Sequence, residues 1–186
     1  MSHSLKRKLS YSDLPESAND GKRYELIRGE LFVNPSPVPV HQRVSRRLAR
    51  QLEDYFHPRA LGEVFQAMTD VILTNHDVFV PDILVVSRAN HISSRGIERP
   101  PVLIVEIGSP STFRLDRTLK FRRYAELGVA HYWIVDLKKQ RIDCFKLEGE
   151  SFQPRISAEG DATLGHPDFE GLTINVASLW LQSPAS

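Results

Sequence analysis

The stretch PVLIVEIGSP, residues 101–110, decides the fold because it holds the most apolar strand pattern of the chain. From Val102 to Ile107 the residues are apolar on both alternating faces, which is typical of a central strand covered on both sides. The exception is Glu106, near the C-terminal end of that strand. A buried, unpaired carboxylate is costly, so Glu106 should pair with a core cation, reach water at the strand end, or bind a metal ion.

A second acid stands in a similar setting. Asp82 lies in the apolar segment VFVPDILVV, residues 78–86, directly after Pro81. Proline cannot donate a ladder hydrogen bond, so Pro81 predicts an edge or an irregularity in this strand. If the strands that contain Asp82 and Glu106 pair, their carboxylates converge on one hard divalent cation. Mg²⁺ characteristically takes one or two carboxylates, together with waters and substrate phosphate.

The rest of the chain predicts a mixed sheet with at least two helices packed against it. A hairpin is expected over residues 24–33, because Arg28-Gly29 suits a tight two-residue turn and places Glu25 and Glu30 on one face. Apolar spacing predicts helices over residues 41–56 and 113–128, the second capped by Ser111 or Thr112 and closed by Gly128. Further strands are predicted over residues 62–68 running into 69–74, and over 131–136, 141–147 and 152–156. Residues 172–180 are expected to form a last strand and a short turn of helix.

The chain offers no good place to divide it into domains. We find no internal repeat, low-complexity block or linker in its 186 residues, which suit one domain. We therefore expect an N-terminal extension over residues 1–20, a single domain over 21–182 and a C-terminal tail over 183–186.

Composition selects no partner. Lys and Arg number 24 against 23 Asp and Glu, and a formal net charge of +1 gives no global attraction to nucleic acid. The single cysteine, Cys144, excludes an intramolecular disulfide, and no Cys/His group has zinc spacing. With no signal-like or membrane-length apolar run, we expect a cytoplasmic protein with no membrane partner. A nucleophile elbow and a phosphate-binding GxxxxGK loop are also absent from the sequence.

Basic residues gather on the first predicted helix, on the side away from its apolar stripe: Arg43, Arg46, Arg47 and Arg50. Such charge runs often mark only a solvated surface, and contact with phosphates is the alternative. His41 stands at the entrance of this helix, as a capping residue or as a phosphate contact.

The second predicted helix follows directly from the strand that bears Glu106. Asp116 and Lys120 are four residues apart and could form a surface ion pair. The same helix could instead aim the Lys120 ammonium at the site of the two acids. Acids, a metal and a lysine are the groups that phosphodiester hydrolysis requires, because they activate water and neutralise developing negative charge.

Six segments in order resemble the "putative restriction-endonuclease-like" family of the PD-(D/E)XK nuclease superfamily: YELIRGEL, HQRV, VPDILVV, LIVEIGSPST, DRTLKFRRYAELGVAHYWIVD and SLW. They extend over residues 24–180. The resemblance implies an α/β fold, a restriction-endonuclease-like mixed β-sheet core flanked by helices. It also implies that Asp82 and Glu106 bind Mg²⁺ or Mn²⁺. The superfamily signature places its lysine where this chain has Gly108; the related family supplies it from the following helix, at the position of Lys120.

By the same resemblance an upstream acid completes the site, Glu25 rather than Glu30, and His41 lies at a phosphate or beside the metal ligands. The implied activity is Mg²⁺-dependent cleavage of DNA, by a homodimer where both strands are cut. The candidate contacts to the DNA backbone are His41, Arg43, Arg46, Arg47, Arg50, Arg114 and Arg117.

Two other functions stay open. One is a catalytically inactive nuclease-fold protein that binds or regulates nucleic acid, which Gly108 and the near-neutral charge favour. The other is a carboxylate-pair hydrolase acting on glycosides, in which the lysine would have no role.

Overall fold

The computed structural model describes residues 7–15, 22–108 and 116–180. Its main sheet has six strands in the order β10-β9-β8-β7-β6-β3, and only β7 and β8 are parallel neighbours. Their bounds are β3 Glu63–Gln66, β6 Ile83–Val86, β7 Leu103–Gly108, β8 His131–Asp136, β9 Arg141–Glu148 and β10 Ser151–Glu159. This arrangement confirms the predicted mixed sheet, with β7 as an interior strand that is buried along its whole length.

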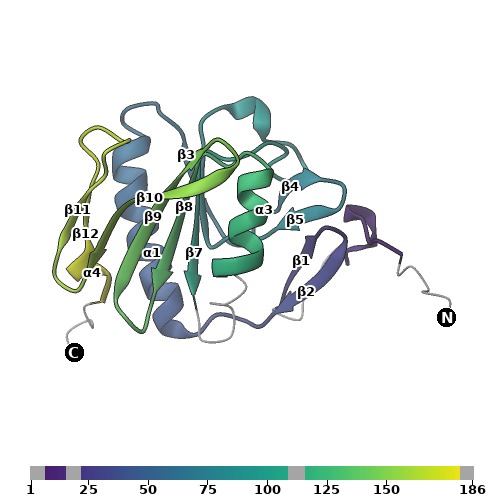
Figure 1. Ribbon diagram of the computed structural model, residues 1–186, viewed down its shortest axis with the longest axis horizontal. Coiled ribbons are helices and arrows are strands. Elements are labelled where there is room, and N and C mark those ends of the chain that lie inside the picture. Colours follow the sequence, from purple (N-terminus) through teal and green to yellow (C-terminus); the bar gives the residue numbers. More distant parts are fainter. Residues whose placement is uncertain (1–6, 16–21, 109–115, 181–186) are drawn as a thin grey trace.

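Helices cover both faces of this sheet (Figure 1), α1 (Pro39–Phe56) on one and α3 (Phe121–Glu126) on the other. Alternation along β7 divides its side chains between two clusters. Leu103 and Val105 pack with the apolar stripe of α1, and Ile104 packs with Tyr124 of α3. Because side chains alternate along a strand, Glu106 shares the face of Ile104 and points toward the α3 side.

A second sheet has the order β2-β1-β5-β4 and lies beside the first. Its strands are β1 Arg23–Ile27, β2 Glu30–Asn34, β4 Val71–Thr74 and β5 Asp77–Phe79. The predicted hairpin register is confirmed, with Glu25 opposite Phe32 and Leu26 opposite Leu31. Arg28 and Gly29 have φ of 55° and 81°, the left-handed pair that a tight hairpin turn requires.

Two predicted strands were wrong in their extent. The segment 78–86 is divided between sheets, because β5 pairs with β1 whereas β6 pairs with β7. The chain crosses between the sheets over residues 80–82, so the irregularity predicted at Pro81 is present. The segments 62–68 and 69–74 likewise do not run together, since β3 and β4 belong to different sheets. An apolar run indicates burial in a strand, but it does not indicate which neighbour that strand pairs with.

The second predicted helix is less regular than expected over its described residues. Its described part is a π-helical turn over Asp116–Lys120 followed by α3, and Gly128, with φ of 80°, follows its end. Residues 111–115, which include the predicted caps and Arg114, lie outside the described residues. A π turn is wider than an α turn and changes the direction of successive side chains.

The remaining elements pack around the sheets. Strands β11 (Thr163–Gly165) and β12 (Thr173–Asn175) form a hairpin that leads into α4 (Val176–Trp180), on the α1 side of the core. Short 3₁₀ turns occupy Tyr11–Asp13 and Ala89–His91. Leu9, Tyr11 and Leu14, from the predicted N-terminal extension, pack against the second sheet. Within the described ranges, no helix has the length and apolar character needed to cross a bilayer.

Candidate active site

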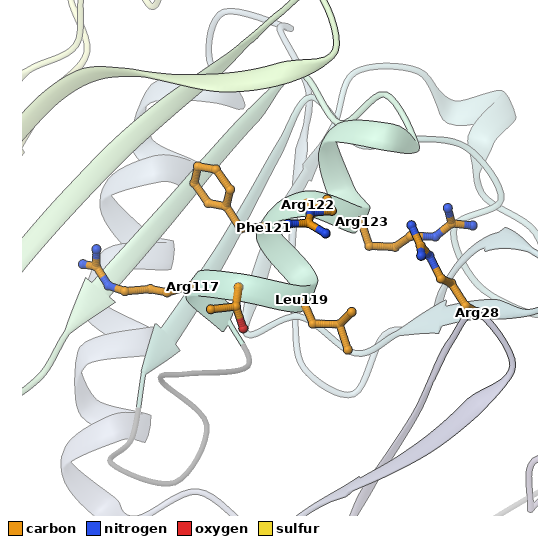
Figure 2. Close-up of a pocket in the computed structure, with 7 residues that line it drawn as sticks. Arg28, Arg117, Leu119, Phe121, Arg122 and Arg123 are labelled. Atoms are coloured by element: carbon orange, nitrogen blue, oxygen red, sulfur yellow. The ribbon is translucent and has the colours of Figure 1, made fainter.

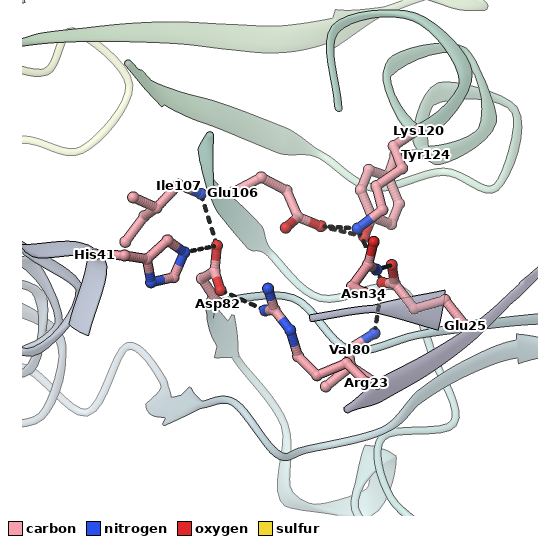
Figure 3. A network of polar contacts seen from close by, with 10 residues as sticks. All are labelled: Arg23, Glu25, Asn34, His41, Val80, Asp82, Glu106, Ile107, Lys120 and Tyr124. Carbon is pink, nitrogen blue, oxygen red and sulfur yellow. Dashed lines mark hydrogen bonds and ion pairs between the residues drawn. The ribbon is translucent and has the colours of Figure 1, made fainter. Parts of the chain in front are cut away.

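The four residues predicted as catalytic lie in one buried network of polar contacts (Figure 3). Glu25 comes from β1, Asp82 from the crossing between the sheets, Glu106 from β7 and Lys120 from the π turn. None of them is more than 3% exposed. Residues nearly one hundred positions apart therefore meet at the place where the two sheets join.

Lys120 connects two of the acids. Its Nζ lies 2.9 Å from Glu25 Oε1 and 3.0 Å from Glu106 Oε1. Lys120 is buried and not at the surface. The side chain of Asp116, with which an ion pair was considered, lies outside the described residues. Pairing with a core cation was one of the three possibilities that the sequence allowed for Glu106, and Lys120 is such a cation.

Glu25 is held from both sides. Its Oε1 accepts the backbone N–H of Val80 at 2.9 Å, and its Oε2 accepts the Asn34 side-chain amide at 2.6 Å. Glu30 shares the same strand face, as predicted, but it lies at the exposed turn end of the hairpin. The geometry therefore brings Glu25, and not Glu30, to the other acids.

Asp82 accepts three hydrogen bonds. Arg23 Nη1 lies 2.5 Å from its Oδ1, and the Ile107 amide donates to its Oδ2 at 2.7 Å. His41 Nε2 also lies 3.1 Å from Oδ2. Burial disfavours the charged carboxylate, but His41, Arg23 and the Ile107 amide outweigh it and hold the pKa of Asp82 below its usual range.

His41 is not the cap of α1. It lies inside the helix, two residues after its start, is buried, and contacts Asp82 directly. His41 therefore lies beside Asp82, one of the two candidate metal ligands. The helix N-cap is Val38, which makes no side-chain capping bond.

Three polar partners in the network were missed in the sequence: Arg23, Asn34 and Tyr124. Tyr124 donates its hydroxyl to Glu106 Oε1 at 2.9 Å, and burial together with the nearby acids raises its pKa well above the usual value. Each had a spacing signal. Tyr124 is four residues after Lys120 on a helix, and Arg23 is two residues before Glu25 on a strand. Asn34 is directly opposite Arg23 in the hairpin.

The network suits a further cation. Among the residues that the structure describes, its three carboxylates, Glu25, Asp82 and Glu106, outnumber the two cations Arg23 and Lys120 before His41 is counted. Asp82, His41 and Arg23 also line a cleft of about 440 Å³, so this end of the buried network lies next to an opening at the surface. Carboxylate oxygens are the ligands that Mg²⁺ and Mn²⁺ prefer. The residues present therefore fit a divalent metal ion.

A second group of possible ligands lies near the start of β8: His131, His166 and Asp168, with one atom from each within 4.8 Å of the others. Here the charge balance is unfavourable for a cation. Asp168 already accepts Lys146 Nζ at 2.7 Å and Arg155 Nε at 2.8 Å. Even with the exposed Glu148 beside Arg155, carboxylates do not outnumber cations. The acid network is thus the better candidate for the metal.

The basic residues proposed to contact DNA differ in their surroundings. Among the described residues, Arg43 makes no side-chain hydrogen bond, and Arg46 and Arg50 are exposed. Arg47 instead donates to the carbonyls of Ser178 and Leu179, at the end of α4, at 3.0 and 3.3 Å. Arg47 therefore holds α4 against α1, so these bonds of its guanidinium stabilise the fold.

Arg117 lines a basic pocket of about 470 Å³ beside the π turn (Figure 2). Its guanidinium pairs with Asp143. In the same pocket, Arg28 and Arg123 pair with Glu126, and Arg123 also pairs with Asp77. The segment thus directs arginines into an open pocket while it directs Lys120 inward to the acids.

A mixed sheet flanked by helices, with clustered acids and a lysine where two sheets join, defines the class of restriction-endonuclease-like proteins. The chain belongs to the Uma2 family, described as "putative restriction endonuclease", whose sequence model matches residues 10–177. This membership confirms the resemblance found in the sequence and supports a nuclease-like function.

One solved structure, titled as a putative nuclease from Anabaena variabilis, superposes with a TM-score of 0.72. It is 20% identical in sequence, and the match covers 91% of this chain and 94% of that one. At that identity the similarity supports the fold alone. The comparison with curated proteins gave no match.

Proposed function

We propose that this protein is a metal-dependent endonuclease that hydrolyses phosphodiester bonds in DNA. The observation that carries the proposal is the meeting of Asp82, Glu106 and Lys120 in one buried network beside an open cleft. Asp82 and Glu106 would hold Mg²⁺ or Mn²⁺. When bound, such an ion supplies a Lewis acid for the phosphate and lowers the pKa of a coordinated water.

Each remaining residue has a role in positioning or charge. Lys120 would orient the attacking water or stabilise negative charge that develops on the phosphate. Glu25 holds Lys120 in place through its 2.9 Å contact, and Tyr124 orients Glu106. His41 and the Ile107 amide orient Asp82, so that its carboxylate needs little rearrangement during the reaction.

The position of Lys120 bears on the main alternative. Gly108 stands where the superfamily signature has its lysine, which favoured an inactive protein that binds or regulates nucleic acid. A lysine from the following helix, 3.0 Å from Glu106, supports an active enzyme instead. A glycosidase receives less support, because it would leave Lys120 without a part in the reaction.

Cleavage of supercoiled plasmid DNA tests the proposal. We expect the wild-type protein to nick or cut plasmid with Mg²⁺ or Mn²⁺ and to stop on addition of EDTA. Asp82→Asn and Glu106→Gln should abolish cleavage, whereas Glu30→Gln, a matched change at the exposed acid, should not. Equal activity in all four proteins would indicate a contaminating nuclease. Salt-dependent DNA binding that survives the two site variants, without cleavage under any metal, would favour the inactive alternative.

Homodimer formation also belongs to this proposal. One such site cleaves one strand, so double-strand cuts need two sites acting together. We expect a homodimer to yield linear plasmid early in the reaction, and a monomer to accumulate the nicked form first.

A further inference from the structure

Asp82 faces the cleft, yet one of its carboxylate oxygens is already occupied by a cation. Arg23 Nη1 lies 2.5 Å from Oδ1, while Oδ2 accepts His41 and the Ile107 amide. A divalent cation that binds Asp82 must share or replace one of these contacts. The Ile107 amide is a neutral donor, whereas the guanidinium of Arg23 carries a full positive charge at all relevant pH values.

The two cations of the network are not equivalent. Lys120 is in contact with two carboxylates, and its side chain is 4% exposed. Arg23 is in contact with one (Figure 3). Its side chain is 10% exposed and lines the 440 Å³ cleft. Of the pair, Arg23 can move toward solvent at the lower cost.

The contact of Arg23 also leaves part of its hydrogen-bonding capacity unused. An arginine fork can bind a carboxylate through two parallel N–H bonds. Here a single guanidinium nitrogen, Nη1, is bonded to Asp82, and the buried Nε has no hydrogen-bond partner within the described part of the chain. A buried donor without an acceptor destabilises this arrangement, so the present position of Arg23 is not its best-bonded one.

From these contacts we infer that Arg23 is the exchangeable counter-ion of the metal site. In the metal-free protein its guanidinium neutralises Asp82; a divalent cation competes for the same carboxylate and displaces the guanidinium toward the cleft. In the cleft the displaced side chain would be free to bind a phosphate of the substrate, since a guanidinium is a strong phosphate ligand. Arg23 therefore lowers the affinity for the metal ion and, once displaced, helps to bind the substrate phosphate. This inference rests on the proposed nuclease function.

Binding of Mn²⁺ alone, measured by electron paramagnetic resonance in the absence of DNA, tests the exchange. Arg23→Gln should bind Mn²⁺ about tenfold or more tightly than wild type, because a unit positive charge is removed a few ångströms from the site. Arg23→Lys, which keeps the charge, should stay near wild type. Arg88→Gln removes the same charge from an exposed residue with no described side-chain bond, and should also leave the affinity unchanged.

In plasmid cleavage, Arg23→Gln should have the opposite effect to that on metal affinity. Arg23→Gln should cleave more slowly than wild type at saturating Mn²⁺, although it binds the metal more tightly. Unchanged or weaker Mn²⁺ affinity in Arg23→Gln would overturn the exchange, and unchanged cleavage would overturn the role at the phosphate. If Asp82→Asn binds Mn²⁺ as well as wild type does, the proposed metal site itself fails, which is a separate result.

A second measurement keeps the test valid if Arg23→Gln does not fold. Mg²⁺ titration of the wild-type protein can be followed by NMR of arginine Nε–H groups. We expect the Arg23 signal to shift or to exchange faster with solvent on Mg²⁺ binding. Arg123 Nε, which donates to Asp77 at 2.8 Å away from the cleft, is the internal control and should not change. An unaffected Arg23 signal at saturating Mg²⁺ would contradict the displacement.

Discussion

Lys120 Nζ lies 3.0 Å from Glu106 Oε1, although the two residues are 14 positions apart and belong to different elements. Gly108, two residues after Glu106, ends β7 and carries no side chain. The π turn that follows directs Lys120 back to the same carboxylate. The lysine of this site thus comes from a helix that folds over the strand, not from the strand itself.

Replacement of Lys120 should affect both stability and cleavage. Lys120→Met leaves Glu25 and Glu106 without their shared cation, so we expect it to lower the free energy of unfolding by about 3–5 kcal/mol. Cleavage of DNA should fall about 100-fold or more, as expected for loss of an electrostatic stabiliser. Urea denaturation and plasmid cleavage measure the two effects.

A double-mutant cycle tests whether the contact between Lys120 and Glu106 is responsible for this loss of stability. The combined variant Glu106→Gln with Lys120→Met should be less destabilised than the sum of its parts, by about 1 kcal/mol or more. Simple additivity would mean that the 3.0 Å contact contributes nothing to folding.

The hydroxyl of Tyr124 should matter more for catalysis than for DNA binding. Tyr124→Phe keeps the ring in the core but removes the 2.9 Å bond to Glu106, at a cost of about 2 kcal/mol in stability. We expect slower cleavage with unchanged affinity for DNA. Tyr55→Phe, which removes a hydroxyl bond to the Glu170 carbonyl, is the matched control and should retain full cleavage activity. Equal activity of both variants would remove Tyr124 from the site.

Arg43 and Arg47, four residues apart on α1, should behave differently. Arg43→Ala should weaken DNA binding and reduce the slope of log affinity against log salt by about one, with no change in melting temperature. Arg47→Ala loses two bonds to the end of α4, and we expect its stability to fall by about 2 kcal/mol. Fluorescence anisotropy at several salt concentrations and thermal melting separate these outcomes. A stable Arg47→Ala with weaker DNA binding would reverse the assignment.

Acid should destabilise the fold through His131 and His166. Burial lowers the pKa of each from 6.5 to about 4. An unfolded chain therefore binds more protons between these values, and stability, complete above about pH 6.5, falls as the pH drops toward 4. His166→Phe keeps a ring against Trp133 and should reduce this pH dependence, whereas His57→Gln, at an exposed residue, should not. Urea denaturation at pH 7.5, 6 and 5 measures how the free energy of unfolding depends on pH. The same pH dependence in wild type and His166→Phe would contradict the prediction.

Much of the scaffold could be predicted because it depends on local patterns. The turn at Arg28-Gly29 is decided by conformations that few residue pairs adopt, and the helix at 41–56 by its apolar spacing. The division of 78–86 between two sheets could not be predicted, because periodicity does not identify strand partners. The same limit hid the contact of Arg23 with Asp82, which joins residues 59 positions apart across the two sheets.

The sequence by itself determined that Asp82 and Glu106 lie in apolar, buried surroundings, where charged residues need a partner or a ligand. It also determined the family, through the ordered series of short motifs. Only the tertiary structure decided which partners these acids have. Packing of the hairpin, the central sheet and the π turn brings Arg23, Glu25 and Lys120 to Asp82 and Glu106, because the side-chain directions at that junction depend on how separate elements pack together.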